Sequence, residues 1–194
     1  MLESYLLFTA IWFVAAATPG IDTMLLLTTS INTGWKSAVS ISLGISTAKV
    51  LLLTITYFGL TALLANNPEV YVVLKIFGCT FLLWRAFKLW TSNLKLSANP
   101  RSGFWPNFSF AFTAAVSNPQ ALLFYVAVVP QVSASTNVFI LNLIIAIGFT
   151  LISLIYIGLA LPIRAWISRG PNQNLVNRLI ALVFVVLAVV IALR

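Results

Sequence analysis

Six long apolar runs, separated by short polar or proline-containing stretches, fill almost the whole of this 194-residue sequence. A helix needs about twenty consecutive apolar residues to cross the hydrocarbon core of a bilayer, and the runs are close to that length. They are continuously apolar, unlike the alternating strands of a membrane barrel. We therefore predict six transmembrane helices, with the bounds Tyr5–Thr29, Ala38–Leu64, Val70–Trp90, Trp105–Val129, Val138–Ile163 and Leu175–Leu193.

The low charge content supports this prediction. Hydrophobic residues make up 61% of the chain and charged residues only 7%, too little charge to cover a water-facing surface. At this length we expect one domain, residues 1–194, whose apolar surplus must face lipid. The eleven Lys and Arg residues lie between the apolar runs rather than in one patch, which argues against a nucleic-acid partner. The sequence thus indicates an all-α integral membrane protein.

The positions of the basic residues predict how the chain crosses the membrane. Lys and Arg gather in and beside the first, third and fifth loops, whereas the loops and termini of the opposite side carry Glu3, Glu69 and Arg194. Loops on the cytoplasmic side of a membrane are enriched in Lys and Arg. We therefore expect the three basic loops inside and both termini outside.

The two halves of the sequence share short patterns in the same order. At an offset near 100 residues, the matching segments are 15–19 with 115–119 and 57–60 with 156–159. Their common order predicts two three-helix repeats, about 1–92 and 104–194. Because three is odd, the second repeat crosses the membrane with inverted topology, an architecture typical of secondary transporters. The polar stretch Thr91–Gly103 is predicted to be the hinge between the repeats.

Proline interrupts the first and fourth apolar runs at corresponding places. Thr18, Pro19 and Gly20 lie inside the first run, and Pro119 lies inside the fourth. Proline removes a backbone hydrogen bond that lipid cannot replace, so such breaks are tolerated where protein or a water-filled cavity covers them. The half-helix ends can then hold the charged groups of a small zwitterion. The alternative is a pair of kinks used only for packing.

Asp22, Lys49 and Lys75 are charged side chains inside apolar runs, where a charge is costly unless it is paired or neutralised. Asp22 is the acid among them, and it is a candidate proton carrier or an anchor for a substrate amine. Its structural alternative is to cap the half-helix after the break. Lys49 and Lys75 are candidates to pair with Asp22 or to bind a substrate carboxylate. Lys49 is the deeper of the two, whereas Lys75 could snorkel to the interface.

The fourth run offers amide groups beside its proline. Asn118 and Gln120 could bind a polar ligand, restore hydrogen bonds lost at Pro119, or join neighbouring helices. The sequence has no histidine, one cysteine and three acids, so a metal site or a His-based catalytic triad cannot be assembled. We expect no metal, no cofactor and no enzymatic activity, and no ATP-binding motif suggests another energy source.

At these residues the sequence resembles the LysE/RhtB family of amino-acid exporters, over nearly the whole chain. The family's first-helix pattern, Pro-Gly followed by Pro and Asp, is similar to Pro19–Asp22 here. Its fourth-helix pattern, Asn-Pro-Lys-Ala followed by an aromatic stretch and Pro-Gln, resembles residues 118–131. Ile21 departs from the second proline and Gln120 from the basic residue. The charge missing at Gln120 could be supplied by Lys49.

The resemblance implies an exporter of amino acids or related small metabolites in a bacterial inner membrane, with a zwitterionic substrate and a proton as coupling ion. Substrate would bind near mid-membrane between the two proline breaks, at a site to which the resemblance adds Tyr125. One repeat would rock against the other, with Asp22 coupling protonation to that motion. Lipid surrounds the bundle, and a homodimer is a further expectation. The competing hypothesis is a membrane assembly or chaperone-like subunit whose intramembrane charges only fix helix packing.

Overall fold

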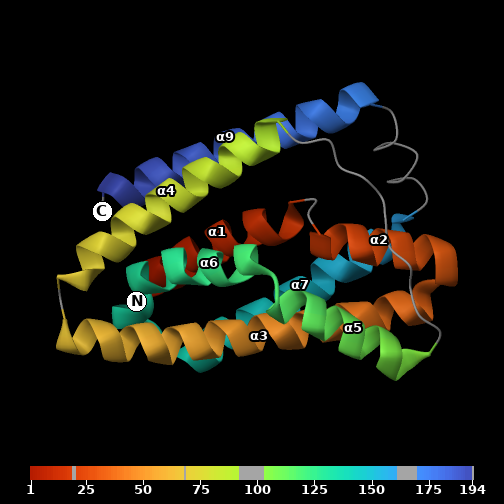
Figure 1. The fold of residues 1–194 in the computed structure, drawn as a ribbon, viewed down its shortest axis with the longest axis horizontal. Coiled ribbons are helices and arrows are strands. Elements are labelled where there is room, and N and C mark those ends of the chain that lie inside the picture. The colour runs from red at the N-terminus through yellow and green to blue at the C-terminus, as the bar shows by residue number, and fades with distance from the viewer. Residues whose placement is uncertain (19–20, 68, 92–102, 161–169, 194) are drawn as a thin grey trace.

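The described part of the chain folds into helices. The computed structural model describes residues 1–18, 21–67, 69–91, 103–160 and 170–193. Its helices, coloured in chain order in Figure 1, are α1 Leu2–Ala17, α2 Ile21–Thr33, α3 Trp35–Asn66, α4 Val70–Thr91, α5 Phe104–Val116, α6 Pro119–Val128, α7 Val138–Gly158 and α9 Gly170–Leu193. Two short 3-10 helices, η1 Val129–Gln131 and η2 Ser133–Ser135, link α6 to α7. The prediction of an all-α chain is confirmed for these residues.

Several of these helices are long and apolar enough to cross a membrane. α3, α4 and α7 each meet that requirement alone, and the pairs α1 with α2 and α5 with α6 meet it together. The described residues therefore contain three to five candidate spans. The last predicted helix, Leu175–Leu193, falls within α9, whose apolar stretch Ala181–Ala192 is shorter than a bilayer span. The predicted end of the fifth helix at Ile163 lies outside the described residues.

The first and fourth predicted helices are each divided by a break at their proline. α2 is bent by 49° from α1, and α6 is bent by 55° from α5. Pro119 is the first residue of α6, a position where a helix needs no backbone N–H, so the second half-helix starts there. Pro19 and Gly20 lie outside the described residues, as does most of the predicted hinge Thr91–Gly103. The helix bounds on either side confirm both interruptions.

α3 is the central helix of the fold. It packs against α2, α5, α6 and α7, while α4 runs beside α9 and also contacts α6. In Figure 1, α4 and α9 form one layer, and α1 and α6 lie between this layer and α3. α1 and α2 both pack on α7, so each bent pair contacts a long helix of the other half. The N-terminus and the end of α9 lie at the same end of the molecule (Figure 1).

Gly44 and Gly148 are among the glycines that let helices from different halves approach closely. Gly44 of α3 faces α5, where an added Cβ would clash with the Phe108 carbonyl and lie 3.0 Å from the Ala111 Cβ. Gly148 of α7 faces α1, where an added Cβ would lie 2.6 Å from the Trp12 ring. At Gly44 the obstacle is backbone, so a side chain there would push the helices apart, whereas at Gly148 the Trp12 ring would have to move. Small residues permit such close packing in membrane bundles.

Large apolar side chains cover much of the outer surface. Phe13, Val73, Phe87, Leu154 and Val186 are each more than half exposed. A continuous apolar surface of this kind is unfavourable in water, whereas the hydrocarbon of a bilayer matches it. The apolar surplus inferred from the composition therefore lies on the outside of the bundle, where lipid would cover it.

Candidate functional site

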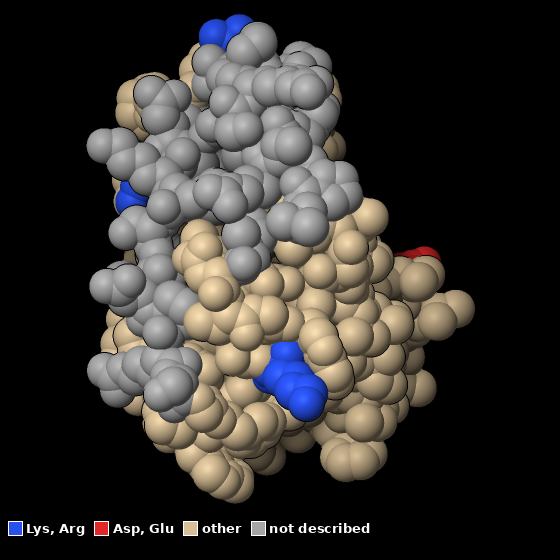
Figure 2. All heavy atoms as spheres, turned by 90° about the vertical axis from the view of Figure 1, so that its right-hand side faces the viewer, with Lys and Arg blue, Asp and Glu red and all other residues tan. Residues whose placement is uncertain are grey.

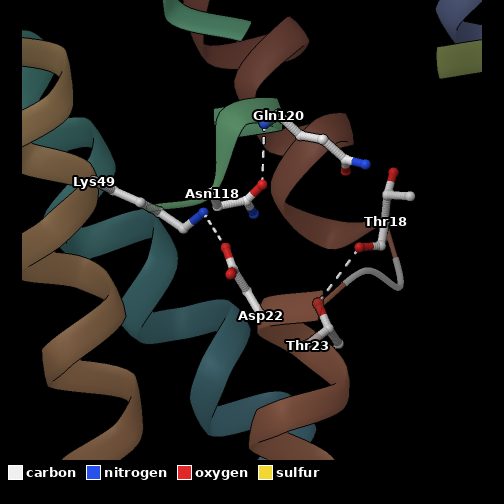
Figure 3. A network of polar contacts seen from close by, with 6 residues as sticks. All are labelled: Thr18, Asp22, Thr23, Lys49, Asn118 and Gln120. Carbon is white, nitrogen blue, oxygen red and sulfur yellow. Dashed lines mark hydrogen bonds and ion pairs between the residues drawn. The ribbon is translucent and has the colours of Figure 1, made fainter. Parts of the chain in front are cut away.

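Asp22 and Lys49 form an ion pair between α2 and α3. The Lys49 ammonium donates to Asp22 Oδ2 at 2.5 Å, and the side chains of Lys49 and Asp22 are 11% and 18% exposed. The chain reverses at Gly34, whose φ of +87° suits glycine, and this reversal brings the start of α2 to the middle of α3. Figure 3 shows the two side chains pointing at one another. The structure thus joins two charges whose contact the sequence left open.

Helix geometry favours a carboxylate at the position of Asp22. α2 begins at Ile21, so Asp22 lies in its first turn, where free backbone N–H groups and the helix dipole attract negative charge. The structural alternative for this residue was a capping role. The hydrogen bond that the structure gives its carboxylate goes to Lys49. Its place in the first turn and its pairing with Lys49 therefore stabilise the same charge together.

An aromatic ring is a second partner of the Lys49 ammonium, beside the Asp22 carboxylate. The Phe149 ring belongs to α7, and its centroid lies 5.1 Å from Lys49 Nζ. Phe149 is 1% exposed. The face of an aromatic ring carries negative charge density and attracts cations. The ammonium therefore has one partner from α2 and another from α7.

Hydroxyl groups satisfy backbone carbonyls at the break between α1 and α2. Tyr156 of α7 donates to the Ala17 carbonyl at 2.9 Å, and Thr23 donates to the Thr18 carbonyl at 3.4 Å. Thr18, which is 3% exposed, donates its own hydroxyl to the Val14 carbonyl at 2.5 Å. The Val14 carbonyl also keeps the backbone N–H of Thr18 as its helical partner. The Ala17 and Thr18 carbonyls at the break itself find side-chain donors, as an apolar environment requires.

A small cavity lies against the ion pair, between the two helix breaks. Its volume is about 60 Å³, which is small beside the roughly 300–1,000 Å³ of ordinary ligand pockets. Charged, amide, hydroxyl and aromatic side chains from both halves of the molecule meet there. The lining residues are Trp12, Ala15, Ala16, Thr18, Asp22, Thr23, Lys49, Gln120, Ala121, Phe124 and Tyr125.

The two amide side chains of the fourth run have different positions. Asn118 caps α6, because its Oδ1 accepts the backbone N–H of Gln120 at 3.0 Å. Of the roles predicted for Asn118, the structure therefore shows the one in which it restores a hydrogen bond lost beside Pro119. Gln120 lines the cavity, and Figure 3 shows its side chain extending toward Thr18. The amide available to a ligand is therefore that of Gln120.

Lys75 lies apart from this cavity. It is half-buried in the second turn of α4 and is not a lining residue. Within the described ranges, the ion pair of Asp22 is with Lys49 and not with Lys75. A position near a helix end is the one from which a lysine can snorkel to the interface. Of the predicted site residues, the structure gathers Thr18, Asp22, Lys49, Gln120 and Tyr125.

A family match covers nearly the whole chain. The sequence profile of the LysE type translocator family matches residues 13–194. The chain belongs to this family. The LysE-type translocators are transporters, so the expectation that the chain is not an enzyme is confirmed, as is its nature as a multi-pass membrane protein.

Curated relatives of this LysE-type translocator carry a common name. The leucine efflux protein of an Enterobacter species is 29% identical over 185 residues, which cover 89% of this chain and 87% of that protein. The leucine efflux protein of Klebsiella pneumoniae is 29% identical over 181 residues, covering 86% and 84%. That of Salmonella choleraesuis is 25% identical over 178 residues, with the same coverage. No solved structure matches the chain.

Some residues of this LysE-type translocator's site were not predicted from its sequence. Trp12 and Phe124 line the cavity, but aromatic residues in an apolar run carry no signal that separates them from core residues. In the sequence, Tyr156 stands out only as part of segment 156–159, which matches segment 57–60. Tyr156 donates a hydrogen bond to a backbone carbonyl at the break. The proline in the sequence indicates that such a donor is needed, but not which residue supplies it.

Proposed function

We propose that this LysE-type translocator is a secondary transporter that exports a neutral amino acid with an apolar side chain across a bacterial inner membrane. The observation that carries the proposal is the ion pair of Asp22 and Lys49 on the wall of a cavity between two helix breaks. One negative and one positive group match the two charged groups of a zwitterion. Ionisable residues inside a membrane bundle mark substrate and ion pathways.

Each member of the pair can recognise one end of an amino acid. Lys49 offers an ammonium to the substrate carboxylate, and Asp22 offers a carboxylate to the substrate ammonium. Gln120 and Tyr125 line the same cavity and can add uncharged hydrogen bonds. Because Asp22 and Lys49 pair with each other in this conformation, substrate binding exchanges their mutual contact for contacts with the zwitterion.

The remaining walls favour an aliphatic side chain. Trp12, Phe124 and three alanines contribute apolar surface to the cavity, and its described lining carries no charged group besides Asp22 and Lys49. The relatives named leucine efflux proteins point to the same chemical class. We therefore infer a leucine-like substrate.

Asp22 is the residue that we propose to carry the coupling proton. Its carboxylate can hold either a proton or the substrate ammonium, and the two ligands exclude each other. Such competition is the requirement for exchange, because one ligand must leave before the other binds. A proton entering from outside would release the substrate there, and its loss on the inside would allow the next substrate to bind. No ATP-binding motif offers another energy source.

A change of conformation is part of the proposal, because the cavity of about 60 Å³ is far smaller than pockets that hold ligands of this size. We propose that the two repeats, about 1–92 and 104–194, rock against each other. The packing supports this arrangement, since α1 and α2 contact α7 as α5 and α6 contact α3. The proposal includes six spans, with α9 as the sixth.

The proposed orientation places both termini outside the cell. Figure 2 views the end at which α2 turns into α3, with Lys or Arg atoms in the lower middle of this face and at its top and left edges, and acidic atoms at its right edge. This distribution supports a cytoplasmic position for that end. A homodimer is our proposal for the assembly, and the mass of the purified protein in detergent tests it.

Efflux from cells tests the function. Cells that lack their own leucine exporters are preloaded with labelled leucine, and wild type, Asp22→Asn and Glu69→Gln are compared at equal membrane abundance. Glu69 is an exposed acid before α4, so its amide variant is a matched control. We expect rapid efflux with wild type and Glu69→Gln, and efflux at the background rate with Asp22→Asn.

Two other results would change the conclusion. Equal efflux with wild type and Asp22→Asn would leave Asp22 a structural role only. If wild type exports no member of a broad amino-acid panel above background, the transporter proposal fails and the assembly-subunit hypothesis gains.

A further inference from the structure

Lys49 contacts the Phe149 ring as well as the Asp22 carboxylate. Lys49 Nζ lies 5.1 Å from the ring centroid, and the Phe149 and Lys49 side chains are 1% and 11% exposed. Little water therefore competes for the ammonium. A cation–π contact that is shielded from water is stronger than the same contact at a surface.

The other cation–π contacts in the described ranges lie at the surface. They join Lys36 to Trp35, Lys88 to Trp84 and Arg178 to Trp90, whose rings are 62%, 43% and 50% exposed. Such exposed pairs are typical of anchors at a membrane interface. The Lys49 contact lies inside the bundle instead, beside a cavity wall.

Phe149 belongs to the other half of the molecule. Lys49 is in α3 and Phe149 in α7, and these two helices pack against each other. The offset of 99 that relates segment 57–60 to segment 156–159 on these two helices pairs Lys49 with Gly148, the residue before Phe149. The cation of one half therefore contacts an aromatic ring contributed by the other half.

We propose that Phe149 is a positioning residue that holds the Lys49 ammonium beside the cavity when no carboxylate pairs with it. This inference rests on the proposed function. In that cycle, the empty transporter with a proton on Asp22 leaves Lys49 without a counter-ion. The face of Phe149 remains as its partner and keeps the ammonium beside the cavity until Asp22 loses its proton and the next substrate binds.

Fluorinated phenylalanines test this role, because fluorine withdraws charge from the ring face with little change of shape. Mono-, di- and trifluorophenylalanine are placed at position 149. The same series is placed at Phe8 as a control. Phe8 is a buried core residue of α1 at 0% exposure, and no described cation faces its ring.

The first readout is transport of labelled leucine by the reconstituted protein. We expect the KM to rise stepwise with the number of fluorines at position 149, by about 2-fold to 30-fold in all. The maximal rate should stay nearly constant, and the Phe8 series should show no trend in KM. Phe149→Trp keeps a ring face and should keep a lower KM than Phe149→Leu.

The second readout does not depend on transport. The unfolding midpoint in detergent is measured along the fluorine series in wild type and in Asp22→Asn. We expect a graded decrease at position 149 that is steeper in Asp22→Asn, where the ring is the remaining partner of Lys49. No gradient in either background would overturn the inference. A gradient in a protein that transports no amino acid would refute the proposed function, and with it the role of Phe149 toward substrate.

Discussion

Lys49 and Asp22 neutralise each other at a place where either charge alone would be costly. Their side chains are 11% and 18% exposed, and their charged atoms are 2.5 Å apart. Removing one partner of a buried pair leaves the other charge without compensation, whereas removing both leaves no charge to compensate. The stability of the pair is therefore a property of the two residues together.

A double-mutant cycle measures this coupling. We expect Asp22→Asn and Lys49→Met each to lower the free energy of unfolding in detergent, and the double variant to lose less than the sum of the two. The expected coupling free energy is about 0.5–3 kcal/mol. If the losses in the free energy of unfolding are strictly additive, the two charges do not interact in the folded protein.

At the residue scale, the sequence indicated the charges but not their contact. Asp22 and Lys49 are visible as charges inside apolar runs, because such residues are rare and costly there. Which lysine meets Asp22 depends on the rotation of α2 against α3, and hydropathy does not report helix rotation. The contact of Phe149 with Lys49 could not be predicted for the same reason, because it depends on where one face of the ring points.

At the element scale, the close packing of α3 on α5 depends on a position without a side chain. An added Cβ on Gly44 would clash with the backbone of α5, and backbone atoms cannot turn aside as a flexible side chain can. Gly59 lies on the same helix with nothing within 4 Å of the same position. The two glycines therefore have different roles, although the sequence shows them as alike.

Alanine substitution separates these two roles. We expect Gly44→Ala to lower the free energy of unfolding by about 1–3 kcal/mol, because α5 must move away. Gly59→Ala should raise it by about 0.5–1 kcal/mol, because alanine favours the helix and meets open space. The midpoint of unfolding in detergent is the measurement. Equal effects of the two substitutions would contradict the packing of α3 on α5.

The elements themselves were largely predictable. The start of α4 at Val70 and of α7 at Val138 coincide with the predicted starts, because a polar or proline-containing stretch ends the preceding apolar run. α3 runs from Trp35 to Asn66 and so extends beyond its predicted bounds Ala38–Leu64 at both ends. The additional residues include polar ones, which a hydropathy limit excludes although they are helical. The breaks were predictable from proline, but their angles were not.

At the scale of the whole molecule, one end is held by hydrogen bonds between the halves. The segment Val129–Asn137 after α6 receives contacts from three elements of the first half. Ser4 bonds Ser135 at 2.6 Å, the Tyr5 hydroxyl accepts the Asn137 N–H, Tyr57 donates to the Ser133 and Thr136 carbonyls, and Tyr71 donates to Gln131 Oε1. A rocking motion that opens this end must break these bonds.

A reversible cross-link tests whether this end opens. Ser4→Cys and Ser135→Cys are combined in a Cys79→Ser background, which removes the native thiol. Their hydroxyls are 2.6 Å apart, so the two cysteines should form a disulfide on oxidation. We expect oxidation to lower leucine efflux to the background rate and reduction to restore it. The single-cysteine variants serve as controls. Full efflux from the oxidised protein would exclude opening at this end.

This arrangement of the whole was only partly accessible from sequence. The offset matches favour two related halves, and this relation stays a prediction. The structure shows that each bent pair contacts a long helix from the other part of the sequence. The hydrogen bonds of Val129–Asn137 could not be anticipated, because hydroxyl groups in loops pair according to the final packing rather than to a local pattern.

The bond from Tyr156 to the Ala17 carbonyl bears on how the protein is made. Ala17 leaves the ribosome before Tyr156, which follows 139 residues later. Until α7 is inserted, the interrupted first helix lacks the donor that covers its exposed carbonyl, so water or the insertion machinery must serve in its place. The first helix pair is therefore completed only after α7 has been inserted, and until then its break depends on a hydrogen-bond donor from outside the chain.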